Sequence, residues 1–256
     1  MKFTFFKTKN SSFKKQGAFF LLACTLFAGC KTAQIPFNPE LNATAMPVKG
    51  RQGIQIGQVI RYGTFSTDKV KRGWTFSYNV PFILRFQGAN EKLSFTQFGP
   101  NGQSVRVSCL SRFKSTDLKV LQEYFGIPLT YKNYFAGTIV TQQEDTWDFI
   151  LHNPNGDFLQ PRESAGYARN FAKTIEIKAV RGLQNQPEWM KKMGIYGHEF
   201  IVSGKPVGAV STINNGTVWI DESVDAETST VIAALATGIL LRTEVEAVET
   251  NRLSAK

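Results

Sequence analysis

The residues best equipped for acid–base chemistry lie close together in this 256-residue sequence. Glu144, Asp145 and Asp148 surround Trp147, and two carboxylates beside an aromatic platform could act as the acid and nucleophile of a glycosidase-like hydrolase. On a strand, however, Asp145 and Asp148 would point to opposite faces, because side chains alternate. The pattern favours a solvated acidic edge strand. A hydrolase that uses an Asp/Glu pair is the alternative.

Other catalytic arrangements lack essential members. The sequence has two histidines, His152 and His198, and Val202 stands where a zinc-protease helix would need the histidine after His198-Glu199. The Gly-x-Ser-x-Gly nucleophile motif does not occur. We therefore expect His152 in a turn and His198 packed beside a strand. The sequence predicts a non-enzymatic protein with no metal and no cofactor.

A small basic set offers a binding chemistry instead. Lys69, Lys71 and Arg72 directly precede a strand-like segment that starts at Trp74. Cations beside aromatic side chains on a loop suit an anionic lipid or a sugar-phosphate headgroup. The alternative is a solvated, mildly basic surface without a specific ligand.

The N-terminal residues indicate where these groups act. Lysines lead into the apolar run Ala18–Phe27, an order typical of a secretion signal and too short for an ordinary membrane span. The ending Leu26-Phe27-Ala28-Gly29-Cys30 resembles the lipobox of bacterial lipoproteins. The resemblance implies removal of residues 1–29 and a diacylglyceryl group on Cys30. Lys31, in place of a retaining Asp, implies the periplasmic side of the outer membrane. The alternative is an ordinary signal peptide, with Cys30 a free thiol.

Composition limits what the mature chain can be. Removing residues 1–29 leaves 227 residues with 25 basic and 20 acidic groups, so the net charge falls from +10 to +5. Nucleic acid is excluded as a partner, because secretion separates the protein from it. Cys109 would be the only cysteine outside the signal and the anchor. It shares a strand face with Val105 and Val107, so we expect a buried, inert thiol and no disulfide.

The remainder reads as a tether followed by one β-rich domain. Residues 30–50 contain three prolines and no periodicity, which predicts a flexible tether spanning about 25 Å. Residues 51–243 form the domain, with short helices expected at 116–125 and 187–193. Period-two patterns predict mostly antiparallel strands at Trp74–Tyr78, Phe82–Phe86, Leu93–Phe98, Val105–Cys109, Thr146–Leu151 and Ile175–Val180.

The C-terminal third predicts two hairpins and a helix. The segment 197–210 reads as two strands around a tight turn, and Asn214-Asn215-Gly216 begins another hairpin. Asp225 is a good N-cap for a helix over about 225–243. Residues 231–241 are apolar or small all round, and eleven residues span only about 16 Å. This helix should be buried by protein, and 244–256 should be a polar tail.

The stretch Gly197–Leu241 resembles the end of the Tubby C-terminal-like fold of phospholipid scramblases. That resemblance implies a closed antiparallel barrel around a central apolar helix, in a family where lipid association recurs. We therefore expect a mainly β (α+β) fold, an antiparallel barrel-like domain with a buried C-terminal helix. The expected function is a lipid-anchored envelope binding or scaffold module. Its expected partners are the membrane, through Cys30, and an anionic lipid or an envelope protein.

Overall fold

The computed structural model describes residues 33–36, 38–53, 55–73, 91–111, 123, 134–152, 164–187 and 194–253. All features discussed below belong to one compact unit, Gln34–Lys256. Within the described residues, thirteen strands form one antiparallel sheet. The strands are β1 (Met46–Pro47), β2 (Arg61–Tyr62), β3 (Phe65–Thr67), β4 (Lys71–Arg72), β5 (Glu91–Phe98), β6 (Ser104–Ser111), β7 (Tyr134–Thr141), β8 (Thr146–His152), β9 (Ser164–Arg169), β10 (Thr174–Arg181), β11 (Ile195–Val202), β12 (Lys205–Ser211) and β13 (Thr217–Ile220).

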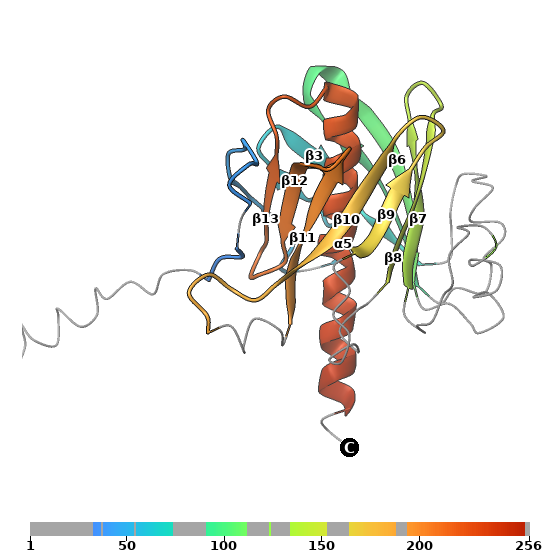
Figure 1. Ribbon diagram of the computed structural model, residues 1–256. Coiled ribbons are helices and arrows are strands. Elements are labelled where there is room, and N and C mark those ends of the chain that lie inside the picture. The colour runs from blue at the N-terminus through green and yellow to red at the C-terminus, as the bar shows by residue number, and fades with distance from the viewer. Residues whose placement is uncertain are drawn as a thin grey trace, which may run out of the picture. The chain divides into compact units, whose positions relative to one another are not determined.

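The sheet curls into a nearly closed barrel (Figure 1). Its strands follow the order β1-β13-β12-β11-β10-β9-β8-β7-β6-β5-β3-β2. The strand β4 lies off this path and pairs with β5, as β3 also does. The two ends of this path meet through Lys49 and Arg61. The Lys49 amide donates to the Arg61 carbonyl at 2.8 Å, and the Arg61 amide donates back at 3.0 Å. Closure satisfies backbone groups that an open edge would expose to other chains.

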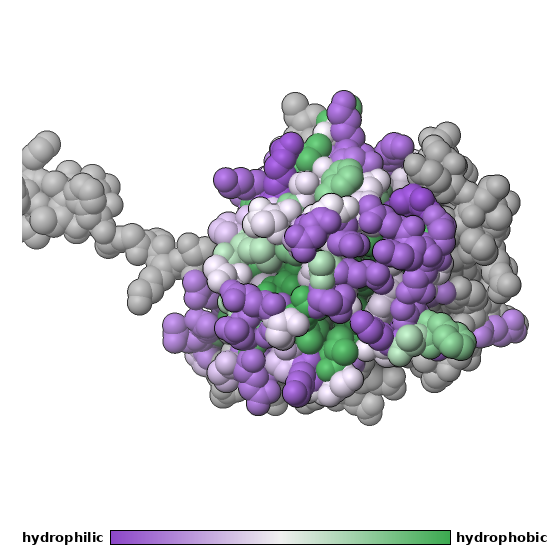
Figure 2. All heavy atoms as spheres, turned by 90° about the horizontal axis from the view of Figure 1, so that it is seen from above, coloured by the Kyte–Doolittle hydropathy of each residue, from purple (hydrophilic) through white to green (hydrophobic). Residues whose placement is uncertain are grey.

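The helix α5 (Ala226–Leu253) runs along the inside of the barrel and leaves it at one end (Figure 1). Asp225 caps its start, because the Asp225 Oδ1 accepts the Thr228 amide at 2.8 Å. The barrel surrounds α5 from Thr230 to Leu241, and every residue of this stretch is buried. Its apolar side chains belong to the same core as inward strand residues such as Phe135, Phe149 and Phe200. The opposite end of the barrel, where α5 begins, is mainly hydrophilic (Figure 2).

The predicted fold class is confirmed: a mainly antiparallel β barrel encloses one buried C-terminal helix. The helix begins at Ala226 as expected and continues to Leu253, past the predicted end near 243. The predicted strands at 93–98, 105–109, 146–151 and 175–180 lie within β5, β6, β8 and β10. No helix among the described residues combines the length and the apolar character needed to cross a membrane.

Sequence reasoning missed two interior strands. β7 is buried at almost every position, so it lacks the alternation that marks a half-exposed strand. β9, Ser-Ala-Gly-Tyr-Ala-Arg, is rich in small residues of low strand propensity. β8 was expected at an edge, which is wrong, because it pairs with both β7 and β9. The predicted strands at 74–78 and 82–86, and nearly all of the helices at 116–125 and 187–193, lie outside the described residues.

The predicted tether does not hold for residues 34–50. Within this segment β1 pairs with β13, and Ile35, Leu41 and Val48 are buried. Ile35 covers Gly197, where an added Cβ would lie 3.0 Å from the Ile35 Cδ1. The segment docks on the barrel because its scattered apolar residues find long-range partners, which a search for local periodicity cannot detect.

Candidate functional site

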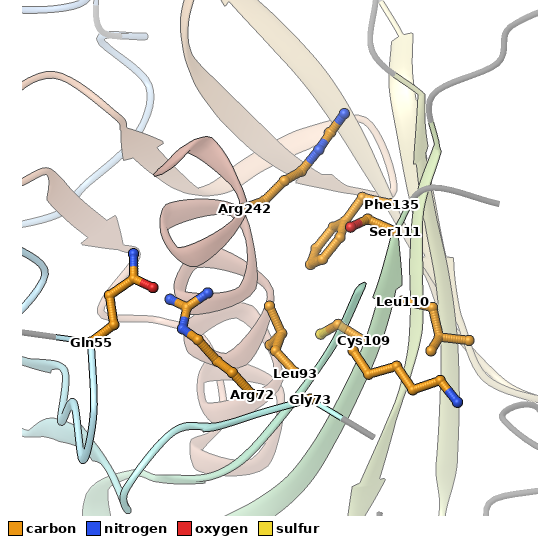
Figure 3. Close-up of a pocket in the computed structure, with 10 residues that line it drawn as sticks. Gln55, Arg72, Gly73, Leu93, Cys109, Leu110, Ser111, Phe135 and Arg242 are labelled. Atoms are coloured by element: carbon orange, nitrogen blue, oxygen red, sulfur yellow. The ribbon is translucent and has the colours of Figure 1, made fainter. Parts of the chain in front are cut away.

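A pocket of about 250 Å³ opens at the end of the barrel from which α5 emerges. We call it the end pocket. Arg72 of β4 and Arg242 of α5 supply guanidinium groups, and Gln55 joins them from the loop before β2. Lys92 of β5 also borders the pocket, but its side chain alternates with the inward Leu93 and therefore lies on the outer face of the strand. Leu93, Cys109 and Phe135 lie in the middle of the pocket, between Arg72 and Arg242 (Figure 3). Segments distant in sequence therefore border one partly apolar, partly cationic space, although the Arg72 side chain points toward Gln55 and the Arg242 side chain points away from it (Figure 3).

The two arginines are held in place by different contacts. The Arg72 Nη2 donates to Gln58 Oε1 at 3.1 Å, and the Gln58 Nε2 donates to the carbonyls of Gly50 and Arg51 at 3.1 and 2.7 Å. The Arg242 guanidinium carbon lies 5.7 Å from the centroid of the Phe135 ring, within the range of a cation–π interaction. Packing and hydrogen bonding thus restrict both charged groups before any ligand arrives.

The middle of the pocket is chemically inert. Cys109 is buried, and this burial raises the pKa of its thiol well above the usual range. A neutral thiol is a poor nucleophile and packs as a small apolar side chain. The sequence predicts that Cys109 is buried, and the structure confirms this.

The arrangement suits a small anion that carries an apolar part. Arginine guanidinium groups bind phosphate and carboxylate oxygens through paired hydrogen bonds. Leu93 and Phe135 offer apolar surface beside these cations. A volume of about 250 Å³ lies slightly below the usual range for drug-sized ligands, so it suits a headgroup or a short segment of a larger molecule.

The structure divides the basic set predicted from sequence. Arg72 lines the end pocket, whereas Lys69 and Lys71 are exposed and do not line it. Sequence reasoning missed Arg242. Arg242 did carry a signal, because it is the first charged residue after the apolar run of the helix. Trp74, the predicted aromatic neighbour, lies outside the described residues.

The acidic cluster does not assemble as a glycosidase-like pair on a platform. Trp147 is buried in the barrel core, so its ring is not available to a sugar. Each carboxylate has a protein partner. Glu144 forms an ion pair with Arg106 at 2.9 Å, Asp145 accepts from Asn170 Nδ2 at 2.6 Å, and Asp148 accepts from Thr138 Oγ1 at 2.9 Å.

The remaining candidate residues take structural places. His198 is buried within β11, as a packed residue, and His152 ends β8. Among the described residues, no group of His, Cys, Asp and Glu side chains is arranged to hold a metal ion. Cys30, the predicted lipidation site, lies outside the described residues.

Comparison of the chain with known family models, curated proteins and solved structures finds no match. The chemistry of the end pocket is therefore interpreted from its own residues.

Proposed function

We propose that this chain is a lipid-anchored protein of the bacterial cell envelope whose β domain binds an anionic group in the end pocket without catalysing a reaction. The observation that carries the proposal is the presence of Arg72 and Arg242 at the border of one partly apolar pocket. The lipobox-like sequence ending at Cys30 supports the anchor, on the periplasmic side of the outer membrane. Two or three acyl chains hold a protein durably on a bilayer, whereas one holds it weakly.

The proposed ligand class is a phosphate or carboxylate ester with an apolar portion. Cations recognise its charge and Leu93 and Phe135 contact its apolar part. A phospholipid headgroup and a free phosphate share the anionic chemistry, but only the lipid supplies the apolar part. The partners of the three carboxylates and the burial of Trp147 support a binding role over hydrolysis.

Binding to the mature full-length chain tests the pocket. The probes are a short-chain phosphatidylglycerol below its micelle concentration, the matching phosphatidylcholine, and inorganic phosphate. We expect phosphatidylglycerol to raise the melting temperature and the other two probes to do so weakly, because a ligand that binds the folded state stabilises it. Stronger binding of inorganic phosphate would identify a phosphate site instead of a lipid site.

Matched variants separate the pocket from the general surface charge. Arg72→Gln and Arg242→Gln should each weaken phosphatidylglycerol binding about tenfold or more, because each loses a charge-assisted hydrogen bond of roughly 1.5–3 kcal/mol. Lys69→Gln and Lys71→Gln remove the same charge from exposed positions outside the pocket and should change affinity less than twofold. Equal losses in all four variants would refute the pocket.

The anchor has its own test. The Cys30→Ser protein should be found in the soluble fraction of cell extracts, and the wild-type protein with membranes. Mass spectrometry of the mature N-terminus should show an acylated Cys30. A Cys30→Ser protein that still sediments with membranes would contradict the lipidation.

A further inference from the structure

The segment 34–50, which docks on the barrel, reverses its direction at the surface. Asn42 lies beside Asp221, directly after β13, because the Asn42 amide donates to Asp221 Oδ2 at 3.0 Å. β1 then runs back along β13 in the antiparallel direction (Figure 1). Asn42, Thr44 and Ala45 are all exposed in this reversal. A part of the chain that is otherwise docked therefore presents a short stretch of polar side chains to solvent.

Asn42 is the central residue of a tight three-residue turn. The Ala43 amide donates to the Leu41 carbonyl at 3.1 Å, which closes the turn around Asn42. The Asn42 carbonyl accepts the Glu222 amide at 3.2 Å, and the Asn42 amide is bonded to Asp221. Among the described residues these backbone groups make all the hydrogen bonds of Asn42. Its side-chain carboxamide is therefore exposed and has no partner in this part of the chain.

The residues around Asn42 form the pattern of an asparagine glycosylation site. Asn42-Ala43-Thr44 matches the acceptor sequence Asn-x-Ser/Thr, in which x is any residue except proline. Bacterial oligosaccharyltransferases also select an acidic residue two positions before the asparagine, and Glu40 stands there. The three side chains that such an enzyme reads are all exposed, whereas Leu41 between them is buried. The turn thus presents the acceptor pattern on its solvent side.

A second Asn-x-Thr sequence lacks these features. Asn215-Gly216-Thr217 lies in the turn that leads into β13, and the Gly216 amide donates to the Ile213 carbonyl at 2.9 Å. Gly216 is buried, and Thr217 belongs to a strand that is paired on both sides. Ile213 occupies the position where the bacterial enzymes need an acidic residue. Asn215 is therefore a natural control within the same chain.

We infer that Asn42 is an acceptor for an N-linked glycan. The inference rests on the proposed function, because this transfer takes place outside the cytoplasm and requires secretion. The donor is an oligosaccharide linked to a polyprenyl diphosphate. The Asn42 Nδ2 attacks the anomeric carbon of the first sugar, so that a C–N bond forms while the C–O bond to the diphosphate breaks. The polyprenyl diphosphate leaves with the electron pair of that bond, and Nδ2 gives up one proton to a base. Nothing is oxidised or reduced.

The fold accommodates the product of this reaction. The exposed Asn42 side chain can carry a bulky, hydrated group without displacing any contact of the turn, because those contacts belong to the backbone. Leu41 is buried, so transfer before the segment docks on the barrel meets the least obstacle. Asn42 contacts the residues between β13 and α5, whereas the end pocket lies where α5 emerges, so the glycan leaves the pocket open.

Intact-protein mass spectrometry tests the site. The full-length chain is expressed in a bacterial host that carries an oligosaccharyltransferase and a lipid-linked oligosaccharide of known mass. We expect the mature protein to gain the mass of one glycan. Asn42→Gln and Thr44→Val should each abolish this gain, and Glu40→Gln should lower the glycosylated fraction several-fold. Asn215→Gln is the matched control and should leave the fraction unchanged, because it removes an asparagine from the other acceptor sequence.

The same spectra separate this inference from the proposed anchor. A wild-type protein that is acylated at Cys30 but carries no glycan would overturn the inference and leave the anchor intact. A glycan that persists in Asn42→Gln, or one that disappears in Asn215→Gln, would also overturn it. A protein that keeps its signal segment would contradict the proposed function. The chain is then exported behind an unrelated secretion signal, where an unmodified Asn42 would overturn the inference by itself.

Discussion

Replacing Thr237 by Val should destabilise the fold through one buried polar layer of the barrel. Thr237 lies in the middle of the apolar part of α5 and is fully buried. Its Oγ1 donates to Gln97 Oε1 of β5 at 2.8 Å and lies 2.9 Å from the Tyr62 hydroxyl. The Tyr62 hydroxyl also donates to the Ala233 carbonyl at 2.7 Å. These three side chains, Tyr62, Gln97 and Thr237, form the polar layer. It connects the strands β2 and β5 to one position along α5.

The size of the effect follows from what each partner loses. The Gln97 Nε2 donates to the carbonyls of Ser66 and Phe98, at 3.0 and 3.2 Å, so the amide cannot turn to find another partner for its oxygen. A buried acceptor that loses its donor costs about 1–3 kcal/mol. Valine matches threonine in shape and leaves no cavity, and Tyr62 keeps the Ala233 carbonyl. We therefore expect a loss of about 2 kcal/mol in the free energy of unfolding.

Urea denaturation measures this loss. With a denaturant slope of about 3 kcal/mol per molar, the midpoint should fall by roughly 0.7 M. Thr230→Val is the matched control, because Thr230 is equally buried on α5, but its hydroxyl donates only to the Ala226 carbonyl of its own helix, at 2.7 Å. That variant should change stability by less than about 0.5 kcal/mol. Equal midpoints for Thr237→Val and Thr230→Val would refute the role of the layer.

Three further predictions address the helix and the pocket wall. Leu235→Asp should abolish folding, seen as loss of the cooperative thermal transition, because it places a charge in the apolar core; wild-type melting would contradict this. Although partial burial opposes it, hydrogen bonds from Thr228 hold the pKa of Asp225 below its usual range. The stabilisation by this carboxylate is present above the unfolded pKa of about 3.9 and is lost as the pH falls through the folded pKa. Near neutral pH the Asp225→Asn variant should therefore be less stable than the wild type by under about 1 kcal/mol. This difference in the free energy of unfolding should disappear in acid, as an acid titration followed by circular dichroism would show. Cys109 should react with a thiol reagent only after urea unfolds the protein, and fast reaction of the native protein would show that the pocket exposes the thiol.

Local signals in the sequence predicted those elements whose structure is decided locally. The β11–β12 hairpin turns at Ser203 and Gly204, both with positive φ (50° and 80°), which agrees with a tight turn at this place in the sequence. Asp225 caps α5 because its side chain reaches the Thr228 amide three residues on. The apolar character of 231–241 on every side predicted a buried helix, and the barrel supplies the burial.

Long-range packing decided the features that sequence reasoning missed. Residues 34–50 show no periodicity, yet Ile35 docks over Gly197, more than 160 positions away. The arginines of the end pocket are equally scattered, with Arg72 on β4 and Arg242 on the helix α5. Clusters of this kind arise from topology. A search for neighbouring basic residues finds Lys69 and Lys71, which remain outside the pocket.

The filled barrel dictates where a ligand can bind. The side chains of α5 occupy the interior, and the polar groups of Tyr62, Gln97 and Thr237 bond to one another, so neither space nor charge is offered inside. Binding chemistry is therefore displaced to the ends of the barrel, and the end pocket lies at the end where α5 emerges.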